Sequence, residues 1–294
     1  MLLLLMHSKR NTRKKSGAPW LAAAMRRSFQ ASIVVPLLDQ RDEWLEQSLR
    51  SALEQSARCE VIVVHSPRVR QSNLDLVAGL KREFDNLVLT PEKPGRGFPG
   101  AINVGVALAS ADRIGLLLSD DWLERDAVEQ CLGHPGDIVS TGQTSYAADG
   151  ATVFEEISRV PCWRTFEDLP SLERKASYLS HFFLFRKHKL QEIGGADEDL
   201  GDIAGAGIDD FEMIWTLLEH GATVSIVERS LYNYRDHSDE RLTLRRREDS
   251  LAGLERILSK HRVTPADRAR IVAAHSRWYG EPIHRVHDRL KARG

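Results

Sequence analysis

The stretch Gly115-Leu116-Leu117-Leu118-Ser119-Asp120-Asp121 decides how this chain folds. It is a run of apolar residues that ends in two adjacent carboxylates. A short run of this kind is typical of a strand buried in a parallel sheet. Open sheets of that class bind ligands at the carboxyl ends of their strands. We therefore expect Asp120 and Asp121 at a ligand-binding edge, where carboxylate oxygens suit Mg²⁺ or Mn²⁺.

Strand and helix patterns alternate on the amino-terminal side of this stretch. We predict strands at residues 32–37, 60–64, 87–89 and 113–118, and helices at 42–55, 74–84 and 101–109. Residues 95–100, with three glycines, are expected to be a loop. Alternation of this kind indicates a sheet with parallel strands and covering helices.

The pattern becomes irregular after about residue 137. Strands are predicted at 138–140, 182–185 and 223–227, and helices near 123–132, at 209–220 and over the tail 247–290. A second pair of carboxylates, Asp209 and Asp210, opens one of these helices.

Composition indicates a globular protein, with 42% hydrophobic and 28% charged residues. The net charge of −1 hides basic ends and an acidic centre over residues 31–243, which argues against a nucleic-acid-binding core. The three cysteines have no CxxC spacing, so we expect neither disulfides nor a zinc site. We expect the three thiols to be buried in a protein of the reducing cytoplasm.

Residues 1–30 begin with a short apolar run that a basic cluster follows. The run is too short to span a bilayer, and the charge order is wrong for a secretory signal. We expect a disordered, basic extension. Solvated basic ends are favoured, and contact of these ends with an anionic membrane surface is the alternative. The expected location is the cytoplasm, with the inner membrane face as a peripheral site.

Several segments between residues 31 and 243 follow one ordered pattern. They are Ser32–Pro36, Leu45–Ser56, Gly100–Gly105, Leu118–Asp121, Gly194–Glu198, Asp209–Glu212 and Tyr234–His237. Together they resemble the motifs of the family 2 glycosyltransferases with the GT-A fold. The set is far more specific than any one motif.

The resemblance implies an α/β fold of the GT-A type, in which helices flank a mixed central sheet and a helical tail follows. It divides the chain into an extension (1–30), a transferase domain (31–243) and a tail (244–294). Residues 31–137 would form the nucleotide-sugar donor half, and 138–243 the acceptor half. The tail would pack against the core or make a homodimer contact.

The function implied by the resemblance is metal-dependent, inverting sugar transfer. The donor would be a nucleotide-sugar, and the acceptor a hydroxyl of a glycan, a lipid-linked molecule or a small molecule. The processive Gln-x-x-Arg-Trp signature is absent from the sequence, which favours single transfers. The resemblance places Mn²⁺ or Mg²⁺ on Asp120 and His237, and makes Asp210 the general base.

Each of these roles has a plainer alternative. Asp120 with Asp121, and Asp209 with Asp210, could cap the helices that follow them. His237 could be a structural, hydrogen-bonded histidine. If Asp210 is the base, the neighbouring Asp209 would raise the proton affinity of the pair.

The resemblance also implies contacts with the substrates. Expected donor contacts are Pro36, Asp39, His65, Asn103, Asp121 and Arg235, and expected acceptor contacts are Trp122 and Asp209. Alternatives are helix capping by Asp39, loop fixing by Asn103 and an ion pair of Arg235 with a carboxylate.

Three positions depart from the family pattern. Leu118 stands in place of the first Asp of the metal motif, Ile102 in place of an Arg, and His65 where an Asp is usual. They motivate a rival class, a catalytically silent binding domain. Nucleotidyl transfer is a second rival, but it needs a basic glycine loop after the first strand, where Leu37-Leu38-Asp39-Gln40 stands instead.

Overall fold

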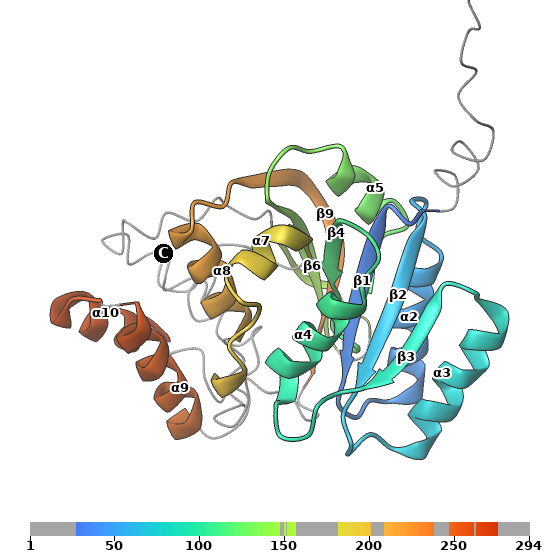
Figure 1. Cartoon of the computed structure of the whole chain (residues 1–294), viewed down its shortest axis with the longest axis horizontal. Helices are drawn as coiled ribbons and strands as arrows, with labels where there is room; N and C mark the ends of the chain where they lie inside the picture. Colours follow the sequence, from blue (N-terminus) through green and yellow to red (C-terminus); the bar gives the residue numbers. More distant parts are fainter. Residues whose placement is uncertain are drawn as a thin grey trace, which may run out of the picture.

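The computed structural model describes residues 28–147, 150, 152–156, 182–200, 209–237, 247–261 and 263–275. Most of the predicted extension, and the end of the predicted tail, lie outside these residues. The described part is a central sheet with helices on both faces (Figure 1).

The sheet has nine strands in the order β3-β2-β1-β4-β8-β6-β9-β5, with β7 paired to β6. The strands are β1 (Ala31–Leu37), β2 (Cys59–His65), β3 (Leu87–Pro91), β4 (Arg113–Leu116), β5 (Trp122–Leu123), β6 (Ile138–Ala147), β7 (Thr152–Glu156), β8 (Phe183–Arg186) and β9 (Val224–Asp236). The first four are parallel, β8 is antiparallel to both β4 and β6, and β6 is parallel to β9. The sheet is therefore mixed, as predicted.

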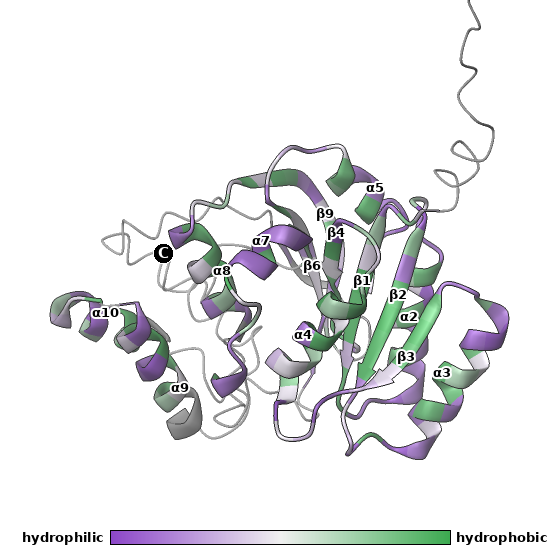
Figure 2. Ribbon diagram, viewed as in Figure 1, coloured by the Kyte–Doolittle hydropathy of each residue, from purple (hydrophilic) through white to green (hydrophobic). Residues whose placement is uncertain are grey.

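Helices cover the two faces in separate groups. The helices are α2 (Asp42–Leu53), α3 (Gln71–Glu83), α4 (Gly97–Leu108), α5 (Ala127–Leu132), α7 (Lys187–Glu192), η2 (Glu198–Leu200), α8 (Asp209–Glu219), α9 (Arg247–Lys260) and α10 (Pro265–His275). Buried residues of α2, α3 and α5 share one apolar cluster, and those of α4, α7 and α8 share another. Figure 2 shows the apolar strands between helices whose outer faces are hydrophilic.

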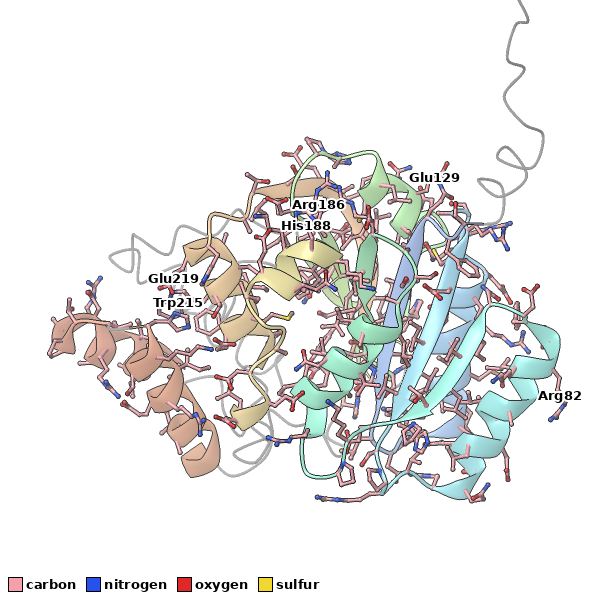
Figure 3. The ribbon with its side chains drawn as sticks, viewed as in Figure 1. Arg82, Glu129, Arg186, His188, Trp215 and Glu219 are labelled. Carbon is pink, nitrogen blue, oxygen red and sulfur yellow. The ribbon has the colours of Figure 1, made fainter. Side chains whose placement is uncertain are left out.

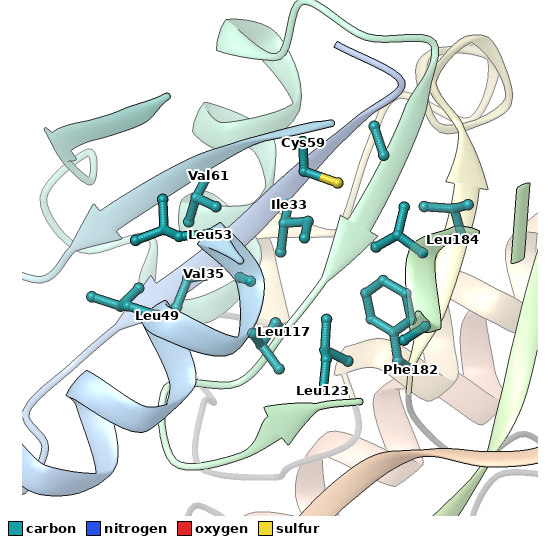
Figure 4. Packing of buried hydrophobic residues seen from close by; sticks show 14 of the residues in the cluster. Ile33, Val35, Leu49, Leu53, Cys59, Val61, Leu117, Leu123, Phe182 and Leu184 are labelled. Carbon is teal, nitrogen blue, oxygen red and sulfur yellow. The ribbon is translucent and has the colours of Figure 1, made fainter. Parts of the chain in front are cut away.

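Strand β1 divides the core between the two faces. Ile33 and Val35 point into the first cluster, seen in Figure 4, and Val34 points into the second. Successive side chains of a strand alternate between faces, so an all-apolar strand is buried on both. Helix α4 approaches β1 so closely that a Cβ at Gly105 would lie 2.3 Å from Val34 Cγ1.

A third apolar cluster joins α9 and α10 to α8 and η2. It contains Leu200, Phe211, Trp215, Leu254, Ile257, Leu258 and Ile271. The tail helices therefore lie against α8, and not against the sheet (Figure 1).

Three sequence expectations were wrong in detail. The glycine loop is shorter than predicted, because α4 begins at Gly97. The helix expected from residue 123 begins at Ala127, since Trp122 and Leu123 pair with β9. The strand expected at 223–227 extends to Asp236, because β6 continues to pair with β9 as far as Asp236.

None of the described helices combines the length and hydropathy that crossing a membrane requires.

Candidate active site

The chain continues from β4 to Asp120, which lies beside the end of β9. His237 follows the last residue of β9, and its Nε2 is 2.9 Å from Asp120 Oδ2. The His237 side chain is 3% exposed and that of Asp120 is 21% exposed. The two residues predicted to share a metal ion are thus in contact, and the carboxylate is the more accessible of the two.

Asp121 is buried beneath this pair, with 1% of its surface exposed. Its Oδ1 accepts a hydrogen bond from the backbone N–H of Arg235 at 2.7 Å, and its Oδ2 accepts one from the hydroxyl of Tyr232. Burial and the nearby charge of Asp121 raise the pKa of Tyr232, so the phenol stays protonated. Asp121, which the sequence predicts as a donor contact, therefore connects the loop after β4 to strand β9.

The guanidinium of Arg235 lies between two indole rings. It is 4.9 Å from the ring centroid of Trp44 and 4.7 Å from that of Trp122. Its Nε donates to the backbone oxygen of Asp120 at 3.0 Å, and a terminal nitrogen donates to Gln47 Oε1 at 2.6 Å. Burial lowers the pKa of Arg235, although the charges of Asp121 and Asp120 oppose this.

Aromatic rings extend this arrangement in both directions. Trp44 also packs against the His237 ring, with centroids 4.5 Å apart, and Trp122 packs against Tyr146 at 4.9 Å. Helix α2, the loop carrying Asp120, and strands β5, β6 and β9 are thereby joined at one edge of the sheet.

The expected donor contacts near β1 and β2 lie at the carboxyl ends of these strands. Pro36 pairs with Val64 inside the sheet. Asp39 accepts two hydrogen bonds from the Arg70 guanidinium, at 2.7 and 2.9 Å. The hydrogen bond from Arg70 lowers the pKa of Asp39, so the carboxylate is ionised at neutral pH. His65 contacts the backbone oxygen of Ser66 through Nδ1 at 3.1 Å.

Asn103 of α4 binds the turn that precedes η2. Its Nδ2 donates to the Ala196 oxygen at 2.9 Å and to Glu198 Oε1 at 3.0 Å, and its Oδ1 accepts from the Ala196 N–H at 2.8 Å. These contacts fit the loop-fixing alternative. Gly195 has φ +86°, and a Cβ there would lie 2.3 Å from Asn103 Oδ1.

Helix α8 begins at Asp209, and Asp210 lies in its first turn. Asp210 Oδ1 accepts a hydrogen bond from the N–H of Phe211 at 2.8 Å. The Asp209 side chain lies outside the described residues. Trp122, the other expected acceptor contact, is half-buried between Arg235 and Tyr146.

Sequence reasoning missed the partners that hold these groups. Tyr232, Trp44 and Gln47 were not singled out, nor was Lys260, which contacts the buried Glu212. Tyr232 and Tyr234, whose aromatic side chains favour strands, were the available signal for a continued strand. The contacts of Gln47 and Lys260 depend on pairings between distant segments.

In the part of the chain that the structure describes, no three His, Cys, Asp or Glu side chains form a metal-binding group. Asp120 and His237 are two neighbouring groups that could hold a cation together. This fits Mg²⁺ or Mn²⁺ sites in which substrate phosphates and water complete the coordination.

A parallel half with acidic residues at its carboxyl edge, continued through the antiparallel strand β8, fits the expected GT-A fold. The sequence profile of Glycosyl transferase family 2 matches residues 32–194, more than half of the chain. The protein belongs to this family and is a glycosyltransferase.

Solved structures share this fold at low sequence identity. S. aureus TarS 1-349 is 17% identical with a TM-score of 0.55, over 84% of this chain and 70% of that one. The mannosyltransferase PcManGT from Pyrobaculum calidifontis, solved in complex with GDP-Man and Mn²⁺, is 17% identical with a TM-score of 0.58, over 94% and 82%. No curated protein sequence matches this chain.

Proposed function

We propose that this glycosyltransferase moves one sugar from a nucleotide-sugar to a hydroxyl acceptor, with inversion at the anomeric carbon and with a divalent cation. The observation that carries the proposal is the contact between Asp120 Oδ2 and His237 Nε2, 2.9 Å apart at the carboxyl edge of the sheet. The proposed donor half is 31–137 and the acceptor half 138–243, with the tail 244–294 beyond them.

Asp120 and His237 would hold the cation. A carboxylate oxygen with an imidazole nitrogen suits Mn²⁺, and Mg²⁺ less well. When bound, the cation neutralises charge that develops on the departing diphosphate. The PcManGT structure contains Mn²⁺, which supports testing this ion first. Asp121 and Arg235 would act behind the pair, because their contacts hold the backbone of Asp120 and the end of β9.

The donor would lie along the carboxyl ends of β1, β2 and β4. We assign donor contacts to Pro36, Asp39 and His65, with Arg70 holding the Asp39 carboxylate in place. Asn103 would act on the donor side through the turn that it fixes. TarS has been solved with UDP and with UDP-GlcNAc, and PcManGT with GDP-Man, so both uracil and guanine donors belong in the test.

Asp210 would be the general base. The acceptor oxygen forms a bond to the anomeric carbon as the bond from that carbon to the diphosphate oxygen breaks. The acceptor proton passes to the Asp210 carboxylate, and the electron pair leaves with the diphosphate. Attack from the face opposite the diphosphate inverts the configuration. Trp122 and Asp209 would contact the acceptor, which is a glycan, a lipid-linked molecule or a small molecule.

The test is a thermal-shift panel with UDP, GDP, UDP-GlcNAc and GDP-mannose, each with Mn²⁺, Mg²⁺ or EDTA. A ligand that binds only the native state stabilises it by about 2.7 kcal/mol when the ligand concentration is a hundred times Kd. This stabilisation raises Tm. We expect a metal-dependent rise with one nucleotide. The rise should disappear in Asp120→Ala and persist in Asp126→Ala, whose carboxylate pairs with Arg229 on the surface. Tm shifts that are equal with metal and with EDTA, or that remain in Asp120→Ala, would refute the proposed site.

A further inference from the structure

Two of the carboxylates of helix α8, Asp210 and Glu212, lie on opposite sides of it. Asp210 and Glu212 are two residues apart, which is about 200° around a helix. Glu212, Trp215, Thr216 and Glu219 form one side, joined by hydrogen bonds from Thr216 to Glu212 at 2.7 Å and from Trp215 to Glu219 at 3.0 Å. Figure 3 shows Trp215 and Glu219 on the side of α8 that faces α9 and α10.

Asp210 begins the other side of the helix. Met213, Ile214 and Leu217 follow it at helical spacing and are buried in the cluster that contains Val34. The proposed base therefore stands at the sheet-facing side of α8, while Glu212 points to the tail helices. Whatever fixes Glu212 also sets where Asp210 lies along and around the helix axis.

Lys260, the last residue of α9, forms an ion pair with Glu212. Its Nζ lies 2.5 Å from Glu212 Oε1 and 3.1 Å from Asp197 Oδ2. Glu212 is 1% exposed, and Asp197 belongs to the turn that Asn103 holds. A single ammonium thus joins the first turn of α8 to the turn before η2, and through Asn103 to α4.

The charges make this junction depend on Lys260. Burial of Glu212 would raise its pKa, but hydrogen bonds from His261, Lys260 and Thr216 outweigh this and lower the pKa to about 2. Lys260 itself has a raised pKa: burial lowers it, and Glu212 and Asp197 more than offset this. Without the ammonium, the buried Glu212 carboxylate would keep its contacts with His261 and Thr216 but lose the cation that also holds Asp197.

We propose that Lys260 is a positioning residue for the transfer reaction. It fixes the first turn of α8, and hence Asp210, against the turn that Asn103 ties to the donor side. The tail helix α9 is then a working part of the transferase. This inference rests on the proposed role of Asp210.

The experiment compares Lys260→Met with Lys189→Met, which removes an exposed ion pair to Glu192 on α7. The first measurement is hydrogen exchange of amides 211–214. We expect at least about tenfold faster exchange in Lys260→Met, because the first turn loses its anchor, and no change in Lys189→Met. Equal exchange in both variants would overturn the positioning role.

The second measurement is release of nucleoside diphosphate from UDP-GlcNAc and GDP-mannose. A small displacement of a catalytic group costs about tenfold to a hundredfold in turnover. We expect that loss in kcat for Lys260→Met, with donor KM within about twofold, and partial recovery in Lys260→Arg. If Lys260→Met does not fold, the double variant Glu212→Gln/Lys260→Met removes both charges and takes its place in both measurements.

Asp210→Asn separates this inference from the proposed function. If Asp210→Asn keeps full turnover, Asp210 is not the base, and the exchange data still decide whether Lys260 anchors α8. If Asp210→Asn abolishes turnover while Lys260→Met keeps both wild-type exchange and wild-type kcat, the base assignment stands and the Lys260 inference fails.

Discussion

The hydroxyl of Tyr232 donates a hydrogen bond to the carboxylate of Asp121, 111 residues away in the sequence. Tyr232 is fully buried and Asp121 nearly so. The bond therefore links the loop after β4 to strand β9, which His237 follows directly.

Replacing Tyr232 by Phe should destabilise the protein. The change leaves Asp121 Oδ2 buried without this donor, which costs about 1–3 kcal/mol. Urea unfolding measures the loss. Asp126→Asn is the control, since that carboxylate pairs with Arg229 at the surface and should cost less than about 1 kcal/mol. Equal stability of Tyr232→Phe and wild type would contradict the described hydrogen bond.

Two adjacent glycines should respond differently to alanine. Gly194 has φ +82° with open space at its Cβ position, so Gly194→Ala should cost about 1–2 kcal/mol of backbone strain. Gly195 has φ +86°, and its added Cβ would also displace the Asn103 amide. Gly195→Ala should therefore be the more destabilising by about 1 kcal/mol or more in chemical denaturation. Equal losses would mean that Asn103 does not hold the turn.

Glu212 should make stability depend on acid pH. Its folded pKa of about 2 lies below the ordinary 4.5, so its contribution is complete above pH 4.5 and is lost as the pH falls toward 2. The difference corresponds to about 3 kcal/mol. The gap in unfolding free energy between wild type and Glu212→Gln should narrow between pH 5 and 3. Glu192→Gln is the control: Glu192 pairs with Lys189 at the surface, so its gap in unfolding free energy should change little with pH. A gap for Glu212→Gln that stays constant with pH would refute the ion pair between Glu212 and Lys260.

Lysine should not replace arginine at position 235. The guanidinium stacks between two indoles and donates in two directions, and an ammonium matches neither arrangement. We expect Arg235→Lys to lower stability by about 1–3 kcal/mol and to weaken the Mn²⁺-dependent Tm shift. Arg229→Lys is the matched control, because its ion pair with Asp126 is exposed. A wild-type Mn²⁺ response in Arg235→Lys would show that Arg235 does not support Asp120.

The central strands could be predicted from the sequence because continuous apolar residues indicate a buried strand. Residues 33–37 and 61–64 are apolar without interruption, and they lie in β1 and β2. The long strand β9 was underestimated, since Glu228, Arg229 and Ser230 interrupt its apolar pattern. Its extent is set by pairing with β6, which is a long-range interaction that local propensity does not encode.

The residues of the proposed site could be predicted from the sequence. The residues that contact them and hold them in place could not. The ordered motifs identified Asp120 and His237, which lie in contact. Nothing local to Trp44 or Tyr232 indicates that one packs on Arg235 and the other binds Asp121. Such contacts follow from how distant elements meet, so they emerge only with the fold.

Strand β9 reaches the proposed site through irregular pairing. Thr141, Gly142 and Gln143 of β6 oppose Val227, Ser230 and Tyr232, so three residues of β9 have no partner in this interval. Side chains of a strand alternate between faces, and a change of one residue reverses every face beyond it. Tyr232 ends the irregular interval, and Arg235 and His237 follow it. The exposed Glu228 and Arg229 can therefore be substituted within this interval at little cost, but a single insertion or deletion there would turn Arg235 and His237 away from Asp120 together.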